Sequence, residues 1–133
     1  MRSYELDSNG HVNNAVYLGY VEEIAVLHAE TLGFGRLWTT AQGGAWVVRR
    51  HEIVYHLPAR YGDELELTTT VVEMRGARAV RQTQINRADA TRLADVTTEW
   101  VWVRAADGRP TRVPREMVDA FGEAGTGMGA VCR

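Results

Sequence analysis

One long helical pattern stands alone ahead of a series of strand patterns, and this order constrains the fold more than any other feature. Between Ala15 and Leu32 the apolar residues recur mostly three or four positions apart, which is helical spacing. Gly33 follows at the position where a glycine commonly ends a helix. A single helix with an apolar face needs a large apolar surface to pack against. The sequence therefore predicts one helix that lies on the surface built by the rest of the chain.

Several segments have the alternation or the β-branched content of strands, and turn sequences separate them. They are residues 45–56, 64–74, 77–87 and 92–104, with a short extended segment at 2–6 ahead of the helix. Strands joined by hairpins pair in the antiparallel sense. The sequence therefore predicts an α+β fold, in which an antiparallel five-stranded sheet wraps around one long central helix. Residues 39–44 are expected to form a loop, and residues 114–121 a short helix or loop.

Composition bounds the class of protein. The chain has 133 residues and a net charge of −2, which suits one domain and gives no general attraction to nucleic acid. No apolar run approaches the roughly 18 residues of a membrane span, and the first residues lack a signal-peptide pattern. Cys132 is the single cysteine, which fits a reducing compartment. We expect a cytoplasmic protein whose domain covers residues 1–121 and whose glycine-rich residues 122–133 form a flexible tail.

The segment directly ahead of the long helix concentrates polar chemistry. It holds a carboxylate at Asp7, an imidazole at His11 and side-chain amides at Asn9, Asn13 and Asn14. The first N–H groups of a helix lack partners, and with the helix dipole they can hold a developing oxyanion. A base or nucleophile placed just ahead of such a site has the geometry that acyl transfer needs. The same residues also suit a turn and a helix cap, so composition alone leaves both readings open.

The pattern Asp7-x-x-Gly10-His11-Val12-Asn13-Asn14-x-x-Tyr17 resembles the signature of hotdog-fold thioesterases, the 4-hydroxybenzoyl-CoA thioesterase-like group. It is similar above all to that of their acyl-ACP relatives, in which an Asp-x-Asn-x-His pattern carries the chemistry. The resemblance covers residues 1–121. It implies a hotdog fold and hydrolysis of an acyl-CoA or acyl-ACP thioester without a metal or redox cofactor. It also implies a homodimer or homotetramer with the active site at a two-fold interface.

Three residues are expected to act on the thioester. Asp7, Asn9 and His11 match the Asp-x-Asn-x-His pattern of the relatives. A carboxylate such as Asp7 can attack the thioester carbonyl as a nucleophile, or it can deprotonate a water as a general base. Asn9 and His11 can orient the water or the thioester, or tune the carboxylate. Both amide and imidazole can instead shape the loop.

Three further residues are expected to bind the substrate. Gly10 lets the backbone turn tightly between strand and helix. The resemblance implies that the N–H at the start of the long helix polarises the thioester carbonyl, and the matching position is Asn14. Tyr17 belongs to the apolar face of the helix, so we expect it in the core, where it can line the acyl pocket.

Other functions find less support. A Gly-x-Ser-x-Gly elbow and a glycine-rich phosphate loop are both missing from the sequence, and His28, His51 and His56 lack metal-ligand spacing. Two alternatives stay open: a hotdog hydratase or dehydratase, and a hotdog that binds acyl-CoA without catalysis. The many arginines could meet CoA phosphates or the acidic surface of a carrier protein, but none is singled out. The sequence does not distinguish CoA from ACP, or an aromatic from an aliphatic acyl group.

Overall fold

A computed structural model describes residues 14–60, 62–122 and 127–132 of the chain. Its elements in chain order are α1 (Asn14–Thr31), α2 (Arg36–Ala41), β1 (Gly44–Tyr55), β2 (Leu65–Arg75), β3 (Arg78–Arg87), β4 (Arg92–Arg104), α3 (Arg115–Gly122) and β5 (Gly127–Cys132). The predicted α+β fold with an antiparallel sheet is confirmed. Among the described residues, no helix combines the length and apolar composition needed to cross a membrane.

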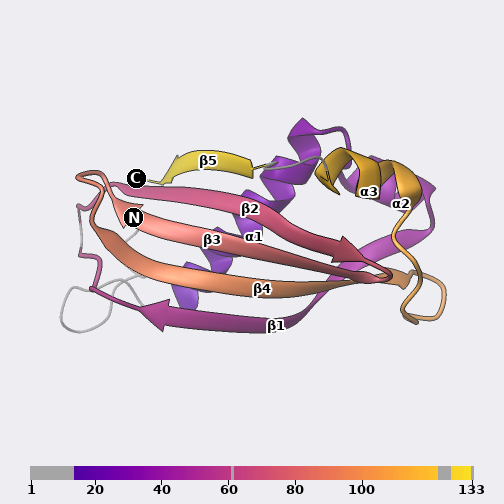
Figure 1. The fold of residues 1–133 in the computed structure, drawn as a ribbon, viewed down its shortest axis with the longest axis horizontal. Helices are drawn as coiled ribbons and strands as arrows, with labels where there is room; N and C mark the ends of the chain where they lie inside the picture. The colour runs from indigo at the N-terminus through magenta and orange to yellow at the C-terminus, as the bar shows by residue number, and fades with distance from the viewer. Residues whose placement is uncertain (1–13, 61, 123–126, 133) are drawn as a thin grey trace.

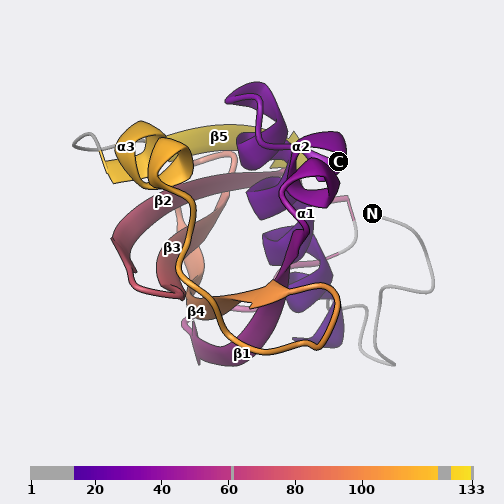
Figure 2. The same cartoon turned by 90° about the vertical axis from the view of Figure 1, so that its right-hand side faces the viewer.

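The five strands form one antiparallel sheet in the order β1-β4-β3-β2-β5. Figure 1 shows α1 crossing one face of this sheet, with α2 and α3 gathered at one end of it. Seen from that end, the sheet is curved and α1 lies on its concave side (Figure 2). The space between α1 and the concave face therefore decides what the protein can bury or bind.

The end of the chain corrects one expectation. Residues 127–132, expected within a flexible tail, form β5 and pair with β2 from Leu65 opposite Cys132 to Thr70 opposite Gly127. The glycines favour disorder, but the open edge of β2 offers a row of unpaired N–H and C=O groups that a strand can satisfy. The edge strand expected at residues 2–6 lies outside the described residues. The fifth strand of the described sheet thus comes from the other end of the chain.

The connection between β1 and β2 is also not the expected hairpin. These two strands are not neighbours, because β4 and β3 lie between them. Residues 56–58 lie at the end of the sheet: the N–H groups of His56 and Leu57 donate to the Leu93 carbonyl, and the Arg87 Nη2 donates to the Pro58 carbonyl. The whole connection, residues 56–64, is much longer than the turn of a tight hairpin.

A short helix replaces part of a predicted loop. Residues 36–41 form α2, whereas residues 39–44 were expected to be irregular. The Phe34 ring packs edge-on against Trp38, with centroids 4.7 Å apart, and Trp38 also lies 6.3 Å from the Trp102 ring. The threonines of this segment have a low helix propensity, which disfavours the helix. The packing of the aromatic rings stabilises it by more than that cost. Tertiary packing therefore explains this helix.

Two groups of side chains fill the space between α1 and the sheet. The first, here called the filled cluster, joins one half of α1 to the sheet and is aliphatic apart from two tyrosines. It contains Tyr17, Tyr20, Val21, Ile24, Ala59, Leu65, Leu67, Ile85, Leu93, Ala94 and Val96. The second, the aromatic cluster, consists of Trp102, Val113, Met117 and Phe121, with Phe34, Trp38 and Trp46 among the partly buried residues packed on it. Each fully buried side chain of this size stabilises the fold by about 1.5–3 kcal/mol.

The inward face of α1 differs from the predicted one at its far end. Leu27 and Leu32 belong to the expected apolar pattern, but they are 40% and 39% exposed. His28 is buried in their place at 2% exposure. Leu27 and Leu32 therefore place apolar side chains on the outer side of α1 as well. A helix that is apolar on two sides is suited to packing against more than one surface.

Candidate functional site

The start of α1 is the part of the predicted catalytic site that the structure describes. Asp7, Asn9, Gly10 and His11 lie outside the described residues. α1 begins at Asn14, so its first backbone N–H groups follow the motif directly. These groups have no carbonyl partner four residues earlier within the helix, and the dipole makes this end positive.

Tyr17 lies in the filled cluster and is 2% exposed. Its hydroxyl accepts a hydrogen bond of 3.2 Å from the Ala59 N–H, and its ring lies 5.8 Å from that of Tyr55. Burial raises the pKa of the Tyr17 hydroxyl above its usual value. The core position is confirmed, and the contact with Ala59 anchors the connection between β1 and β2. Its contact with an acyl group stays a prediction, because Tyr17 does not line the cavity described next.

A cavity of about 290 Å³ opens beside the aromatic cluster, between the second half of α1 and the sheet. Its walls are mainly small aliphatic and aromatic side chains, including Ala25, Ala29, Trp46, Val71, Trp100 and Phe121. An apolar cavity of roughly 150 Å³ holds a benzene molecule, so this one accommodates a ligand about twice that size. Ala25 follows Asn14 by eleven positions, or about 16 Å along the helix axis. The cavity therefore begins beyond the middle of α1, well away from the start of the helix.

The cavity wall contains one buried arginine. Arg81 on β3 is 6% exposed, and its side chain lines the cavity. Its Nη1 donates to His28 Nδ1 at 2.8 Å and to Thr69 Oγ1 at 3.3 Å, while its guanidinium lies 5.6 Å from the centre of the Phe121 ring. Burial lowers the pKa of Arg81 to about 10, which leaves it charged near pH 7. The apolar cavity thus has a positive charge in its wall.

His28 is the buried partner of this arginine. Burial and the neighbouring charge of Arg81 lower the pKa of His28 to about 4, so the ring is neutral near pH 7. Because Arg81 donates to Nδ1, the proton of the neutral ring is on Nε2. That Nε2 is buried and has no hydrogen-bond partner among the described residues. His28 therefore accepts a hydrogen bond from Arg81 without neutralising its charge.

A second polar group lies beside the first on the concave face. His51 on β1 is hydrogen-bonded through Nδ1 to Thr98 Oγ1 at 3.0 Å and lies 3.3 Å from Glu22 Oε1 through Nε2. The strand register places Arg81 opposite Thr98, and Thr98 opposite His51. Arg81, Thr98 and His51 therefore form a polar row across three strands, between the filled and aromatic clusters.

The other histidine of this region is on the outside. The exposed His56 Nε2 lies 2.8 Å from Asp95 Oδ2, whereas His51 is turned toward α1. The side chains of these two histidines thus lie in different surroundings, although the residues are only five positions apart. Within the described part of the chain, no three His, Cys, Asp or Glu side chains gather as a metal site would require.

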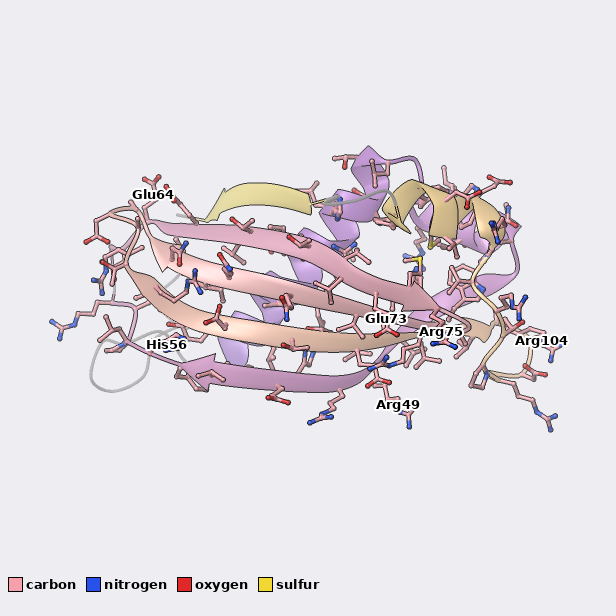
Figure 3. All side chains as sticks on the ribbon, viewed as in Figure 1. Arg49, His56, Glu64, Glu73, Arg75 and Arg104 are labelled. Atoms are coloured by element: carbon pink, nitrogen blue, oxygen red, sulfur yellow. The ribbon has the colours of Figure 1, made fainter. Side chains whose placement is uncertain are left out.

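Sequence reasoning singled out neither Arg81 nor His28. Most other arginines lie on the surface: Figure 3 shows Arg49, Arg75 and Arg104 toward the end of the sheet where α2 and α3 lie. The signal that could have found Arg81 is the alternation of β3. Ala79, Thr83 and Ile85 are buried at two-residue spacing, and Arg81 shares their face.

Comparison with known proteins gives the family. A profile of the thioesterase-like superfamily matches residues 1–121. The acyl-CoA thioester hydrolase YbgC of Escherichia coli O6:H1 is 29% identical over 117 residues, which are 88% of this chain and 87% of that protein. The long-chain acyl-CoA thioesterase FadM of Escherichia coli K12 is 37% identical over 76 residues, or 57% of each chain.

Solved structures agree with this result. A thioesterase from Thermus thermophilus, crystallised with coenzyme A and zinc, superimposes with a TM-score of 0.78 at 25% identity, over 91% of this chain and 86% of that one. The hotdog fold predicted from the motif and from the order of elements is confirmed, and so is the class of enzyme. The chain belongs to the thioesterase-like superfamily.

Proposed function

We propose that this thioesterase hydrolyses acyl-CoA thioesters to a free acid and a thiol, with Asp7 as the nucleophile or general base. The observation that carries the proposal is that α1 begins at Asn14, directly after the Asp7–His11 motif. Free N–H groups and the positive end of the helix dipole favour an oxyanion at that point. The names of the related hydrolases YbgC and FadM support acyl-CoA as the substrate class.

The proposed reaction uses one carboxylate and one helix end. Asp7 attacks the thioester carbonyl, or it takes a proton from a water that attacks instead. The carbonyl oxygen becomes an oxyanion near the N–H of Asn14, the C–S bond breaks, and the leaving thiolate takes up a proton. With water as the attacking group this releases the free acid, whereas with Asp7 as the nucleophile a second step follows, in which water cleaves the acyl–Asp7 anhydride to the acid and the free carboxylate. Asn9 and His11 orient the water or the carbonyl, and Gly10 allows the tight turn that brings them together.

The cavity beside the aromatic cluster is the proposed place for the acyl group. Its apolar walls remove hydrocarbon or aromatic surface from water, which favours binding by about 25 cal/mol for each Å² buried. Its start lies about 16 Å from Asn14 along α1, so the acyl group extends along the helix from the thioester toward Ala25. A carrier-protein thioester fits the same arrangement, because only the acyl part enters.

A homodimer or homotetramer is part of the proposal. β1 has β4 on one side and forms an end of the described sheet, and Val47, Val54 and Tyr55 on it are each about half exposed. This strand of 12 residues has no partner on its outer edge among the described residues, and its exposed apolar side chains favour pairing with another copy. We propose that two copies join their β1 edges, so that the sheet wrapped around each α1 continues across the dimer. The cytoplasmic location stays a prediction from the single cysteine.

Replacing Asp7 by Asn tests the reaction. The amide keeps the size of the side chain but removes the base, so kcat/KM for a panel of acyl-CoAs should fall at least about a hundredfold. Thiol release measured with a thiol reagent reports the rate. Asp119→Asn is the matched control, because Asp119 is exposed on α3 and pairs only with Arg115 among the described residues. A wild-type protein that binds acyl-CoA but releases no thiol would point instead to a non-catalytic binding protein.

Sedimentation of the wild-type protein tests the assembly. At micromolar concentration we expect a dimer or tetramer, because pairing covers the β1 edge. Val54→Lys places a charge on that edge and should shift the protein toward monomer. Thr68→Lys, an exposed substitution on β2, is the control. A fully active monomer would contradict the shared-interface arrangement.

A further inference from the structure

We infer that Arg81 makes the cavity a site for acyl groups that end in a carboxylate, so that ω-carboxyacyl thioesters are the preferred substrates. The inference rests on the proposed thioester hydrolysis and adds the class of acyl group. It depends on three features of the cavity: a buried charge, donors that are free to bind, and apolar walls around them.

The charge of Arg81 has no acidic counterpart in the described part of the chain. Other arginines on the sheet pair with carboxylates: Arg92 Nη1 lies 2.8 Å from Asp95, and Arg87 Nε lies 3.3 Å from Asp63. Arg81 is 6% exposed and instead contacts the neutral His28 and Thr69. Burying a charge without a partner is strongly unfavourable. A carboxylate that enters the cavity supplies the missing counter-charge.

The geometry leaves donors for such a carboxylate. All hydrogen bonds between the Arg81 guanidinium and described residues run through Nη1. Nε and Nη2 form the other edge of the planar group, and two parallel N–H donors match the two oxygens of a carboxylate. Phe121 lies against the guanidinium and His28 and Thr69 fix Nη1, so the group is already oriented. Little side-chain freedom is then lost when a ligand binds.

The walls define the rest of the ligand. Ala25, Ala29, Val71 and Phe121 line the cavity together with Arg81. A ligand with an apolar body and one anionic end meets both requirements. The volume of about 290 Å³ corresponds to about ten water-sized groups, since a water takes up about 30 Å³. The far end of a long acyl chain, with its terminal carboxylate, is of that size.

A chain that ends in a methyl group binds less well in this cavity. It removes water from the guanidinium but gives it no acceptor in exchange. Hydrogen bonds to charged groups contribute enough to distinguish the two ligands by about tenfold to a hundredfold in affinity. The preference should therefore be visible between two acyl-CoAs that differ only at the far end.

The test compares hexadecanedioyl-CoA with hexadecanoyl-CoA, because only a long chain reaches the cavity from a thioester at Asn14. Binding is measured by calorimetry on the Asp7→Asn variant, which lacks the proposed base, and kcat/KM is measured on the wild type. We expect hexadecanedioyl-CoA to bind at least tenfold more tightly. Arg81→Gln in the same background should bring the ratio to about one or below, whereas Arg78→Gln should leave it unchanged. Arg78 is the matched control because it lies on the same strand with an exposed side chain paired to Glu73 and Glu99.

Two further variants keep the test decisive if Arg81→Gln does not fold. Arg81→Lys keeps the charge but loses the two-pronged donor edge, so the preference should fall and remain above one. Ala79→Leu narrows the cavity but keeps Arg81, so both ligands should bind more weakly while the preference for the dicarboxylic chain remains. Equal binding of the two acyl-CoAs, or a preference for hexadecanoyl-CoA, overturns the inference while leaving hydrolysis intact. Preferred binding of hexadecanedioyl-CoA without hydrolysis by the wild type overturns the proposed reaction alone.

Discussion

The two halves of the space under α1 differ in how they are filled. Around Tyr17 and Ile24 the filled cluster closes against the sheet, with Leu65, Ile85 and Leu93 fully buried. Around Phe121 the aromatic cluster stands beside a cavity of about 290 Å³ with a charged guanidinium in its wall. The polar row of Arg81, Thr98 and His51 crosses the sheet between them.

This difference in packing indicates that one half of the space under α1 stabilises the fold and the other half is suited to binding a ligand. Close packing contributes most where every apolar atom has neighbours, and a void removes those contacts. Large aromatic side chains can still hold a wall in place around a void: the Trp46 ring lines the cavity and lies 5.2 Å from the Trp102 ring behind it. A Cβ added at Gly44 would overlap Trp102, so the support of this wall is tightly packed. We interpret the first half as the stabilising core and the second as a cavity kept open by rigid rings.

The largest expected effect separates the halves by stability. Ile85→Ala removes a fully buried side chain from the filled cluster and should lower the free energy of unfolding by about 2–5 kcal/mol. Val71→Ala, at the cavity wall, should lower it by only about 1 kcal/mol, because that side chain already borders empty space. Urea unfolding of both variants checks the comparison. Equal losses would show that the two halves are packed alike.

A smaller effect concerns the buried pair at the boundary. The pKa of His28 is about 4 in the folded protein and about 6.5 when unfolded, so the unfolded state binds more protons between these values. Stability from the neutral ring is present above about pH 6.5 and is lost as the pH falls toward 4. At pH 5 the loss should be about 2 kcal/mol.

His28→Gln is the variant that isolates this contribution, because an amide oxygen still accepts from Arg81 but does not titrate. The difference in stability between pH 7 and pH 5 should be about 2 kcal/mol smaller in the variant than in the wild type, by urea unfolding at both pH values. All other side chains are the same in the two proteins, so their contributions cancel in the comparison. An identical pH dependence of stability in the two proteins would show that His28 makes no such contribution.

The smallest expected effect tests the side of α1 that faces neither half. Gly19 is exposed in the middle of α1, and a Cβ built there meets no described atom within 4 Å. Gly19→Ala should therefore raise the stability by about 0.5–1 kcal/mol through helix propensity alone. Thermal unfolding checks the sign. A loss of stability together with a change in oligomeric state would show that another copy packs against this side.

Local patterns were enough to predict most of the framework. The helix at 15–32 and the strands at 45–56, 64–74, 77–87 and 92–104 lie within a residue or so of α1 and β1–β4. The order of the strands in the sheet could not be predicted, because periodicity indicates which residues share a face but not which strands are neighbours. β5 and α2 were missed for a related reason: the open edge of β2 and the rings around Trp38 exist only after folding.

The candidate site divides in the same way. Asp7, Asn9 and His11 were found from a motif, and their roles stay predictions because those residues lie outside the described chain. Arg81 was passed over because a lone arginine in a strand is usually solvated. Its alternation with Ala79 and Thr83 indicated the buried face, but the depth of burial and the partner His28 depend on how α1 and α3 close over the sheet.

The strand order has a consequence for the sequence of events during synthesis. β2, β3 and β4 are consecutive and pair with their neighbours through short turns, whereas β1 must wait for β4, nearly forty residues later, before it finds its partner. α1 leaves the ribosome earlier still, with apolar side chains such as Val26 and Ile24 on opposite sides and no sheet to receive them. A nascent chain stalled before β4 should therefore be the most aggregation-prone form of this protein. Early pairing of β2 with β3 should be the first step that reduces this tendency.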